Sequence, residues 1–401
     1  MRRLWSISLR VLAVHNNYSS RVPSGENLAV RDETSWLRAA GVDVKTHEAH
    51  NDAVVAGGAT ARLRQAAESV WSVSAQRRLA DDVERFRPDV VHVHNLFPLL
   101  TGSVPWAALR RDLPVVWTVH NRRARCVNGT NFRVGEPCDL CKPGWRVPGV
   151  RHACYGGSSL ASALVSVSSS LYAGIARRRV TTIAISEAVK TWLVTEAGFT
   201  PERVQVKYNG VPAPTVEGEP PGTSRRFVFA GLLGAHKGVG LLLDAWARAD
   251  LPADVELHVA GDGVLGPDVA AAAQRDPRIT WHGHVRPEGV HALMAGARAV
   301  VVPSRWEEPF GRVAAEALAQ GRPVITTGSG GLAEIVDDTC GWVTGTRPEA
   351  LAAALVTAAG NDEDVARKGK EAARRHDEMF SPAATTRALL DVYTSLTGRP
   401  Q

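Results

Sequence analysis

Short runs of β-branched and aromatic residues alternate with longer Ala- and Leu-rich stretches along almost the whole chain. The short runs have the length and composition of buried strands, and the longer stretches are typical of helices. The predicted strands are 10–14, 42–46, 89–94, 114–119, 181–186, 203–209, 226–231, 255–261, 298–304 and 322–327. Strands that alternate with helices indicate parallel sheets covered on both faces. The pattern therefore predicts an α/β chain with two doubly wound sheets.

The pattern is interrupted at residues 212–226, PAPTVEGEPPGTSRR, which contain four prolines and little that could be buried. Such a stretch is typical of a linker between domains. We therefore expect a first Rossmann-like domain over 1–211 and a second over 227–379. Residues 380–401 contain an amphipathic pattern that begins at a Ser-Pro signal, and we expect a helix that crosses back to the first domain.

The composition is that of a soluble globular protein, with 401 residues, 44% hydrophobic and 22% charged. It excludes a disordered, collagen-like or multi-span membrane chain. By inspection, no apolar run approaches the roughly 18 residues that cross a bilayer. The first 17 residues are similar to a short signal peptide, but they include Arg10 and no small-residue cleavage site. A cytoplasmic location is expected, with the inner face of the membrane as a further option.

The net charge of +6 is unevenly distributed. Residues 1–209 contain 28 Lys and Arg against 17 Asp and Glu, whereas residues 210–401 contain 19 against 24. The halves therefore carry +11 and −5. A basic half can face nucleic acid, an anionic membrane or an acidic substrate. It can equally be the solvated surface of an Arg-rich protein.

The densest group of chemical signals lies in residues 300–343. Glu308 precedes a proline, which keeps it extended, and a helix is predicted to begin near Gly311. Glu316 follows about one and a half turns into that helix. Two carboxylates thus flank a helix N-terminus whose free N–H groups can hold phosphate. This arrangement suits a ligand with phosphates in the middle and hydroxyls at both ends, namely a nucleotide diphosphate sugar.

The spacing of Glu308 and Glu316 resembles the E-x7-E motif of retaining GT-B glycosyltransferases of family 4 (glycosyl transferases group 1), and the surrounding GRPVI and GGLAEIV sequences resemble that family too. The resemblance implies two Rossmann-like domains that face a cleft. It implies that Glu308 contacts hydroxyls of the donor sugar and Glu316 the ribose. Backbone N–H groups of four residues would bind the sugar and diphosphate: Phe310, Gly311, Arg312 and Val313.

A second donor-side signal follows the strand at 226–231, where Gly231 allows close approach and Lys237 precedes a predicted helix. A lysine there can neutralise a diphosphate as a point charge. The family pattern pairs this lysine with an arginine, for which this chain has Leu232. Three arginines are candidates to replace it: Arg226, Arg286 and Arg305. Gly261 and Asp262 form a turn that the resemblance places under the nucleotide, and Val285 lies in the loop that it places beside the base.

In the first half, His120 ends a predicted strand, and the resemblance implies that it orients the donor sugar. Gly25 belongs to a loop that is glycine-rich in the family but reads Ser-Gly-Glu-Asn here. His92 and His94 share one face of a strand, where we expect them to line the acceptor side rather than bind metal.

The predicted chemistry uses His120, Lys237 and Glu308 and no catalytic metal. Retaining hydrolases use a carboxylate nucleophile, and we expect none near His120. The resemblance implies front-face attack instead, with the leaving phosphate accepting the proton. Lys237 and helix N-termini would then stabilise the departing diphosphate.

Four of the five cysteines, Cys126, Cys138, Cys141 and Cys154, fall within an aperiodic stretch. In a cytoplasmic protein their spacing favours structural zinc, with reduced thiols, a disulfide or an iron–sulfur cluster as alternatives. Some family members resemble this stretch, which suggests a subgroup with a four-cysteine insert over 126–154. Cys340 is expected to be a buried turn residue.

The leading hypothesis is a hexosyltransferase that uses a nucleotide diphosphate sugar, with uridine as the expected base. The acceptor is expected to be a cell-surface or lipid-linked glycan intermediate, with peripheral membrane contact, and a small-molecule secondary metabolite is the alternative. A GT-B epimerase would lack the E-x7-E motif. A zinc-containing nucleic-acid-binding protein would need aromatic residues among its arginines. We therefore expect no nucleic acid as partner.

Overall fold

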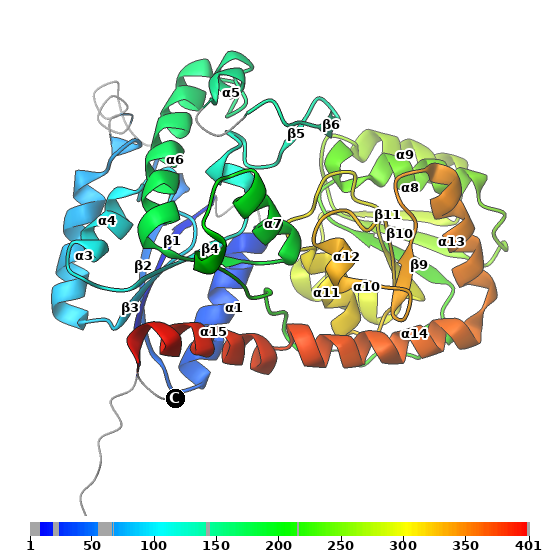
Figure 1. Cartoon of the computed structure of the whole chain (residues 1–401). Coiled ribbons are helices and arrows are strands. Elements are labelled where there is room, and N and C mark those ends of the chain that lie inside the picture. Colours follow the sequence, from blue (N-terminus) through cyan, green and yellow to red (C-terminus); the bar gives the residue numbers. More distant parts are fainter. Residues whose placement is uncertain are drawn as a thin grey trace, which may run out of the picture. The chain divides into compact units, whose positions relative to one another are not determined.

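The computed structural model describes residues 9–18, 24–54, 66, 68–141, 145–214 and 216–398. They form two compact units, each of which contains one large parallel sheet (Figure 1). Unit 1 covers the described parts of 1–131, 139–210 and 385–401. Unit 2 covers the described parts of 132–138 and 211–384.

Unit 1 is built on six parallel strands in the order β2-β1-β3-β4-β7-β8. The strands are β1 Arg10–Asn17, β2 Asp43–His50, β3 Val90–Val93, β4 Val115–Val119, β7 Thr181–Ala184 and β8 Val204–Val206. The helices are α1 Gly25–Ala39, α3 Val73–Phe86, α4 Ser103–Leu109, α5 Val147–Arg151, α6 Ser159–Arg179, α7 Glu187–Thr195 and α15 Pro382–Thr397. The first three residues of α15 are grouped with unit 2.

The side chains of β1 alternate between the two faces of its sheet. Val11 and Ala13 pack into a buried cluster with Leu37 of α1 and with Leu389 and Tyr393 of α15. The C-terminal helix therefore completes the core of unit 1, although the whole of the sheet of unit 2 lies between it and β8 in the sequence.

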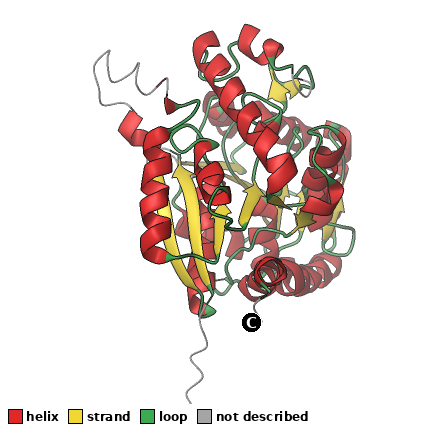
Figure 2. Ribbon diagram, turned by 60° about the vertical axis from the view of Figure 1, so that its left-hand side comes forward, coloured by secondary structure: helices red, strands yellow, loops and turns green. Residues whose placement is uncertain are grey.

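Unit 2 has six parallel strands in the order β11-β10-β9-β12-β13-β14. They are β9 Arg226–Ala230, β10 Glu256–Ala260, β11 Ile279–Gly283, β12 Ala299–Val302, β13 Val324–Thr326 and β14 Gly341–Val343. The helices are α8 Val239–Arg248, α9 Gly266–Arg275, α10 Pro287–Ala295, α11 Arg312–Ala319, α12 Leu332–Ile335, α13 Pro348–Gly360 and α14 Asp362–Arg375. Helices lie along the parallel strands of the sheets (Figure 2).

All ten predicted strands are present, and the expectation of two doubly wound parallel sheets is confirmed. Strands β11 and β14 are not among the ten predicted from the pattern, and neither is the antiparallel pair β5 Phe132–Arg133 and β6 Glu136–Pro137 within the cysteine-containing stretch. Pairs of residues are too short to carry a periodic signal.

Residues 212–226 were expected as a linker, and the described part of this stretch, 212–214 and 216–226, lies with unit 2. The Ser224 hydroxyl donates to the Gly296 carbonyl at 2.7 Å, and the buried Arg298 guanidinium donates to the carbonyls of Gly222 and Ser224. A proline-rich stretch with few apolar residues can thus be fixed by hydrogen bonds to its backbone, which the hydrophobic pattern does not report.

Helix α6 is long and apolar enough to cross a membrane by length and composition, with a mean hydropathy of 1.4 over its best window. The expectation that no apolar run approaches this length is therefore corrected. One such helix is weak evidence for a span, because core helices pass the same test. Ser162, Val165 and Tyr172 of α6 are buried within unit 1.

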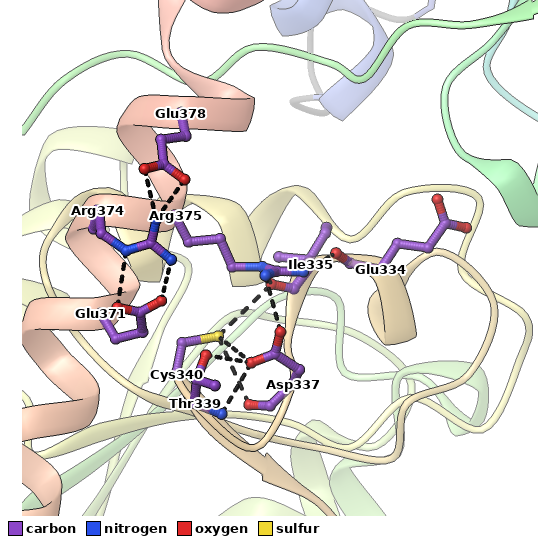
Figure 3. A network of polar contacts seen from close by, with 9 residues as sticks. All are labelled: Glu334, Ile335, Asp337, Thr339, Cys340, Glu371, Arg374, Arg375 and Glu378. Carbon is purple, nitrogen blue, oxygen red and sulfur yellow. Dashed lines mark hydrogen bonds and ion pairs between the residues drawn. The ribbon is translucent and has the colours of Figure 1, made fainter.

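A polar network in unit 2 ties α12 to α14 (Figure 3). Arg375 donates to the carbonyls of Glu334 and Ile335 at 2.8 Å and pairs with Asp337 at 2.9 Å. Cys340 is fully buried in the turn before β14, as expected, and its thiol lies 3.7 Å from the Asp337 carbonyl. The network fixes α12, and α12 in turn packs against the start of α11.

Candidate functional site

The donor-side residues of unit 2 lie where two neighbouring strands end. The chain runs from β9 to β10 and β11 on one side and returns to β12 on the other, so the strand order reverses between β9 and β12. Ligands of open parallel sheets bind at the carboxyl ends of strands at such a reversal. Gly231 follows β9 and Ser304 follows β12 closely, which places the two predicted signals at one edge of the sheet.

Lys237 and Glu308 form an ion pair at this edge. The Lys237 ammonium donates to Glu308 Oε1 at 2.5 Å, and the Ser304 hydroxyl donates to the same oxygen at 2.8 Å. The Glu308 side chain is 7% exposed and that of Lys237 29%. Burial alone raises the pKa of Glu308, but the adjacent Lys237 more than offsets it, so the pKa lies below its ordinary value. Glu308 is therefore an ionised carboxylate in a mostly dry site.

The backbone between Glu308 and Glu316 follows the predicted course. Glu308 is extended and bridges Gly330, and α11 begins at Arg312 with Gly311 as its N-cap. Gly311 has φ 107°, and a Cβ there would lie 2.5 Å from Leu332 of α12. Only glycine satisfies both conditions without strain. The N–H groups at the start of α11 thus lie between the two carboxylates.

Glu316 is held by a neighbour that the sequence argument considered only for its backbone. The Arg312 Nε donates to Glu316 Oε1 at 2.7 Å, and both side chains are about 15% exposed. Phe310 and Val313 complete the segment, and the Phe310 ring is buried.

Gly261 and Asp262 lie beside Gly231 at the ends of β10 and β9. The Gly231 N–H donates to the Ala260 carbonyl at 3.0 Å, and a Cβ on Gly261 would lie 1.8 Å from the Gly231 oxygen. Asp262 Oδ1 accepts from the Gly263 N–H at 2.7 Å, which is the geometry of a turn residue. Val285 lies in the loop between β11 and α10.

The three arginines considered as replacements at Leu232 differ in position. Arg226 begins β9 and pairs with Glu256, so it lies at the opposite end of the strand from the donor-side edge. Arg286 caps α10. The Arg305 N–H donates to the His236 carbonyl at 2.9 Å, next to Lys237. Arg305 is the candidate that lies near the lysine.

His120 lies in a small cavity of unit 1 that encloses about 50 Å³. It follows β4, while His94 follows β3 and His15 belongs to β1. His120 Nε2 lies 3.1 Å from His94 Nδ1. Burial is the largest cause that lowers the pKa values of His120 and His94, so both rings are neutral at neutral pH.

A carboxylate also lines this cavity, which corrects the expectation that none lies near His120. Glu26, on the first turn of α1, accepts hydrogen bonds at Oε2 from the Tyr18 hydroxyl at 3.1 Å and from Asn121 Nδ2 at 3.4 Å. The glycine pattern of the loop gives no signal for its acidic residue, so Glu26 could not be placed in this cavity from the sequence. Gly25 is the first residue of α1, and residues 19–23 of its loop lie outside the described residues.

The four cysteines are divided between the two units, Cys138 with unit 2 and the others with unit 1. In unit 1, Cys126 Sγ lies 2.9 Å from Asn128 Oδ1, and a Cβ on Gly149 would lie 3.2 Å from Cys141 Sγ. Cys154 N–H donates to the Gly149 carbonyl. Over the described ranges, the sulfurs do not form a group of three metal-ligating atoms within 4.8 Å. Zinc binding stays a prediction.

Two charged residues were missed by sequence reasoning. Glu33 of α1 and Lys207, just after β8, form an ion pair, and their side chains are 9% and 3% exposed. A lysine that continues the strand pattern 203–209 must be buried with a counter-ion. That was the available signal for Lys207. Its partner could not be identified, because α1 and β8 are distant in sequence.

Two family models match the chain. "Glycosyltransferase Family 4" matches residues 27–213, and "Glycosyl transferases group 1" matches residues 224–361. A D-inositol 3-phosphate glycosyltransferase of Xylanimonas cellulosilytica is 31% identical over 327 residues, which are 78% of this chain and 73% of that protein.

Other matches are shorter or more distant. A GDP-mannose-dependent alpha-(1-6)-phosphatidylinositol dimannoside mannosyltransferase of Mycobacterium tuberculosis is 32% identical over 38% of this chain and 40% of its own length. Among solved structures, Anabaena HepE in complex with UDP has a TM-score of 0.68 at 18% identity, and the match covers 96% of this chain and 100% of that one. The similarity extends over both units and shows the same GT-B architecture.

Proposed function

This chain belongs to the GT-B glycosyltransferases of family 4, and from that premise we propose that it transfers a hexose from a nucleotide diphosphate sugar to an acceptor hydroxyl with retention of configuration. Lys237 binds the diphosphate, Glu308 the sugar hydroxyls and Glu316 the ribose. The observation that carries the proposal is the Lys237–Glu308 ion pair, placed with the N-terminus of α11 at the strand-order reversal of unit 2.

The donor is tested by thermal-shift titration with UDP-glucose, UDP-N-acetylglucosamine and GDP-mannose. Uridine is our proposed base, and HepE was solved with UDP. The guanosine arm is included because the mycobacterial relative uses GDP-mannose. We expect Glu316→Ala to abolish the shift and Glu349→Ala, an exposed glutamate of α13 in the same unit, to leave it unchanged. Absence of any shift with all three sugars would overturn the donor assignment.

We propose front-face attack, in which the acceptor hydroxyl loses its proton to the departing phosphate. The new glycosidic bond forms as the bond to the phosphate oxygen breaks, and no residue of the chain is altered. Lys237 and the N–H groups of α11 stabilise the negative charge that develops on the diphosphate. His120 contacts the sugar.

Glu26 provides the test of this mechanism, because it is the carboxylate that shares the cavity of His120. A double-displacement route would need it as a nucleophile that forms a glycosyl-enzyme intermediate. Incubation with a fluorinated donor, followed by intact-mass measurement, should show no added sugar. An adduct that disappears in Glu26→Gln would overturn front-face attack.

The acceptor is proposed to be a lipid-linked or cell-surface glycan at the cytoplasmic face of a membrane. Leu160, Val167 and Leu171 of α6 are 71%, 50% and 45% exposed, and their spacing places them on one face of the helix. Exposed Arg178 and Arg179 end the same helix. An apolar stripe with basic residues at its end is suited to an anionic bilayer surface. The excess of basic residues in the first half of the chain favours the same partner.

Sedimentation with vesicles of anionic and of neutral lipid tests this contact. We expect binding to anionic vesicles that Leu160→Asp weakens. Val264→Asp is the matched control, because Val264 is 84% exposed in unit 2. Equal binding by both variants, or no binding by the natural chain, would favour the alternative, a soluble small-molecule acceptor such as a secondary metabolite.

A further inference from the structure

A chain of buried polar side chains leads through unit 1 to His120. Glu33 lies at its start, with Oε2 bound by the Lys207 ammonium and Oε1 facing His94 Nε2 at 3.5 Å. His94 Nδ1 lies 3.1 Å from His120 Nε2. Glu33 Oε1 and His94 Nε2 are both buried, and within the described part of the chain neither has a hydrogen-bond partner. The two atoms without partners thus face each other.

These atoms belong to a group that could be considered for metal binding, since ligand atoms of Glu33, His92 and His94 lie within 4.8 Å of one another. Two observations oppose this. The Lys207 ammonium already binds Glu33, and a second cation beside it would be repelled. Both ring nitrogens of His92 are also engaged, Nδ1 with the Tyr393 hydroxyl at 2.6 Å and Nε2 with Thr118 Oγ1 at 2.8 Å.

The Glu33 carboxylate is ionised, because its ion pair with Lys207 offsets the effect of burial and holds its pKa below the ordinary value. A carboxylate only accepts hydrogen bonds, so the proton of neutral His94 is favoured on Nε2, toward Glu33. His94 Nδ1 then carries a lone pair and accepts from His120 Nε2–H. The remaining nitrogen, His120 Nδ1, is left as an acceptor.

We propose that Glu33, through His94, is a positioning residue that fixes the tautomer of His120, so that His120 Nδ1 accepts a hydrogen bond from a hydroxyl of the bound sugar. The inference rests on the proposed function only for the identity of that hydroxyl. The tautomer itself is a property of the chain alone. The hydrogen bond that one ring nitrogen of a functional histidine makes, often with a carboxylate, commonly determines which of the two nitrogens carries the proton.

The Glu33→Gln substitution tests the inference. Lys207 needs an acceptor, so the amide oxygen should face Lys207 and the amide NH₂ should face His94 Nε2. The proton of His94 then moves to Nδ1, and His120 Nδ1 changes from acceptor to donor. Nitrogen NMR of chain labelled in its histidine rings reads this directly, with His120→Asn used to assign the signals.

In the natural chain we expect the bare-nitrogen signal of His120 on Nδ1 and the N–H signal on Nε2. In Glu33→Gln the two should exchange. Tyr393→Phe is the matched control, because it removes a hydroxyl that hydrogen-bonds His92, a neighbour of Glu33 that is not a member of the path through His94 to His120. The opposite tautomer in the natural chain would overturn the inference without any variant, so misfolding of Glu33→Gln does not leave it untested.

Turnover provides a second readout. We expect Glu33→Gln to lower kcat by roughly 2- to 10-fold, the effect of losing one hydrogen bond between uncharged groups. In a His120→Ala background the same substitution should cause no further loss, because Glu33 acts only through His120. An undiminished loss in that background would indicate a merely structural role. If the tautomer is as stated but His120→Ala retains full activity, the proposed function of His120 fails while the inference about Glu33 stands.

Discussion

The Lys237–Glu308 pair gives the sharpest energetic prediction, because removing the lysine leaves a buried carboxylate without its counter-ion. Breaking a fully buried pair costs about 3–5 kcal/mol, whereas a surface pair contributes about 0–1 kcal/mol. Glu308 is 7% exposed and Lys237 29%, and Ser304 still donates to the carboxylate in the variant. We therefore expect Lys237→Ala to lower the free energy of unfolding of unit 2 by about 2–3 kcal/mol at neutral pH.

The pH dependence that Glu308 gives to the stability of unit 2 should have opposite signs in the natural chain and in Lys237→Ala. In the natural chain the pKa of Glu308 lies below the ordinary 4.5, so the stabilisation by the pair is present above that value and is lost as pH falls through the folded-state pKa. Without Lys237, burial dominates and raises the pKa of Glu308. The variant should then gain stability as pH falls from neutral, when the carboxyl takes up a proton on folding.

Hydrogen exchange of β9 and β12 amides in urea, at about pH 5 and about pH 7.5, reports the stability of unit 2 separately from unit 1. Adding Glu308→Gln to Lys237→Ala should restore most of the loss, because the buried charge is gone. Arg226→Ala, which breaks the exposed pair with Glu256, is the control and should cost less than about 1 kcal/mol. An equal loss at both pH values, with no recovery in the double variant, would refute the reasoning.

Three further outcomes are expected. Gly311 has φ 107°, and a new Cβ there would lie 2.5 Å from a leucine. Gly311→Ala should therefore lower the free energy of unfolding of unit 2 by about 1–3 kcal/mol and lower its melting temperature. Gly240 on α8 faces open space, so Gly240→Ala should be neutral or stabilising. Hydrogen bonds from an arginine two residues on are the chief cause that lowers the pKa of Asp276 to about 2. Asp276 should therefore add about 1–2 kcal/mol to the free energy of unfolding at neutral pH, and this contribution should be lost as pH falls from about 4 toward 2. Urea unfolding of Asp276→Asn across that range should therefore converge with the natural chain at acid pH. Metal analysis should find one zinc per chain, lost in Cys138→Ser/Cys141→Ser, and protein purified without zinc would refute the four-cysteine prediction.

The parts of the fold that the sequence predicted are those with a local signal. Strand β12 is a continuous apolar run, β9 is one after Arg226, and β10 alternates polar and apolar residues. Each is followed closely by a glycine or a serine at which the donor-side residues begin. The direction of each strand and the reversal between β9 and β12 then place Gly231 and Ser304 at one edge.

The contacts between distant segments could not be predicted. The Lys237–Glu308 pair joins residues 71 apart, and the Lys207–Glu33 pair joins residues 174 apart. Each pair depends on which strands are neighbours in the sheet and on where along each strand the following loop begins. Hydrophobic periodicity reports neither, so neither of the two ion pairs could be predicted from the sequence. Glu33 itself lies on the buried face of α1, where a charged residue indicates that a counter-ion is present but does not show which residue supplies it.

These contacts change how the charge distribution along the chain is interpreted. Residues 210–401 carry a net charge of −5, although a nucleotide diphosphate is itself an anion. The acidic residues that determine the net charge lie largely in water, where a Debye length of about 8 Å screens them from a ligand. Lys237 and the α11 N-terminus act at contact distance in a mostly dry site, where the same charge is worth several times more. The affinity for an anionic donor should therefore depend strongly on Lys237 and weakly on exposed acids such as Glu349, and raising the salt concentration should change it little.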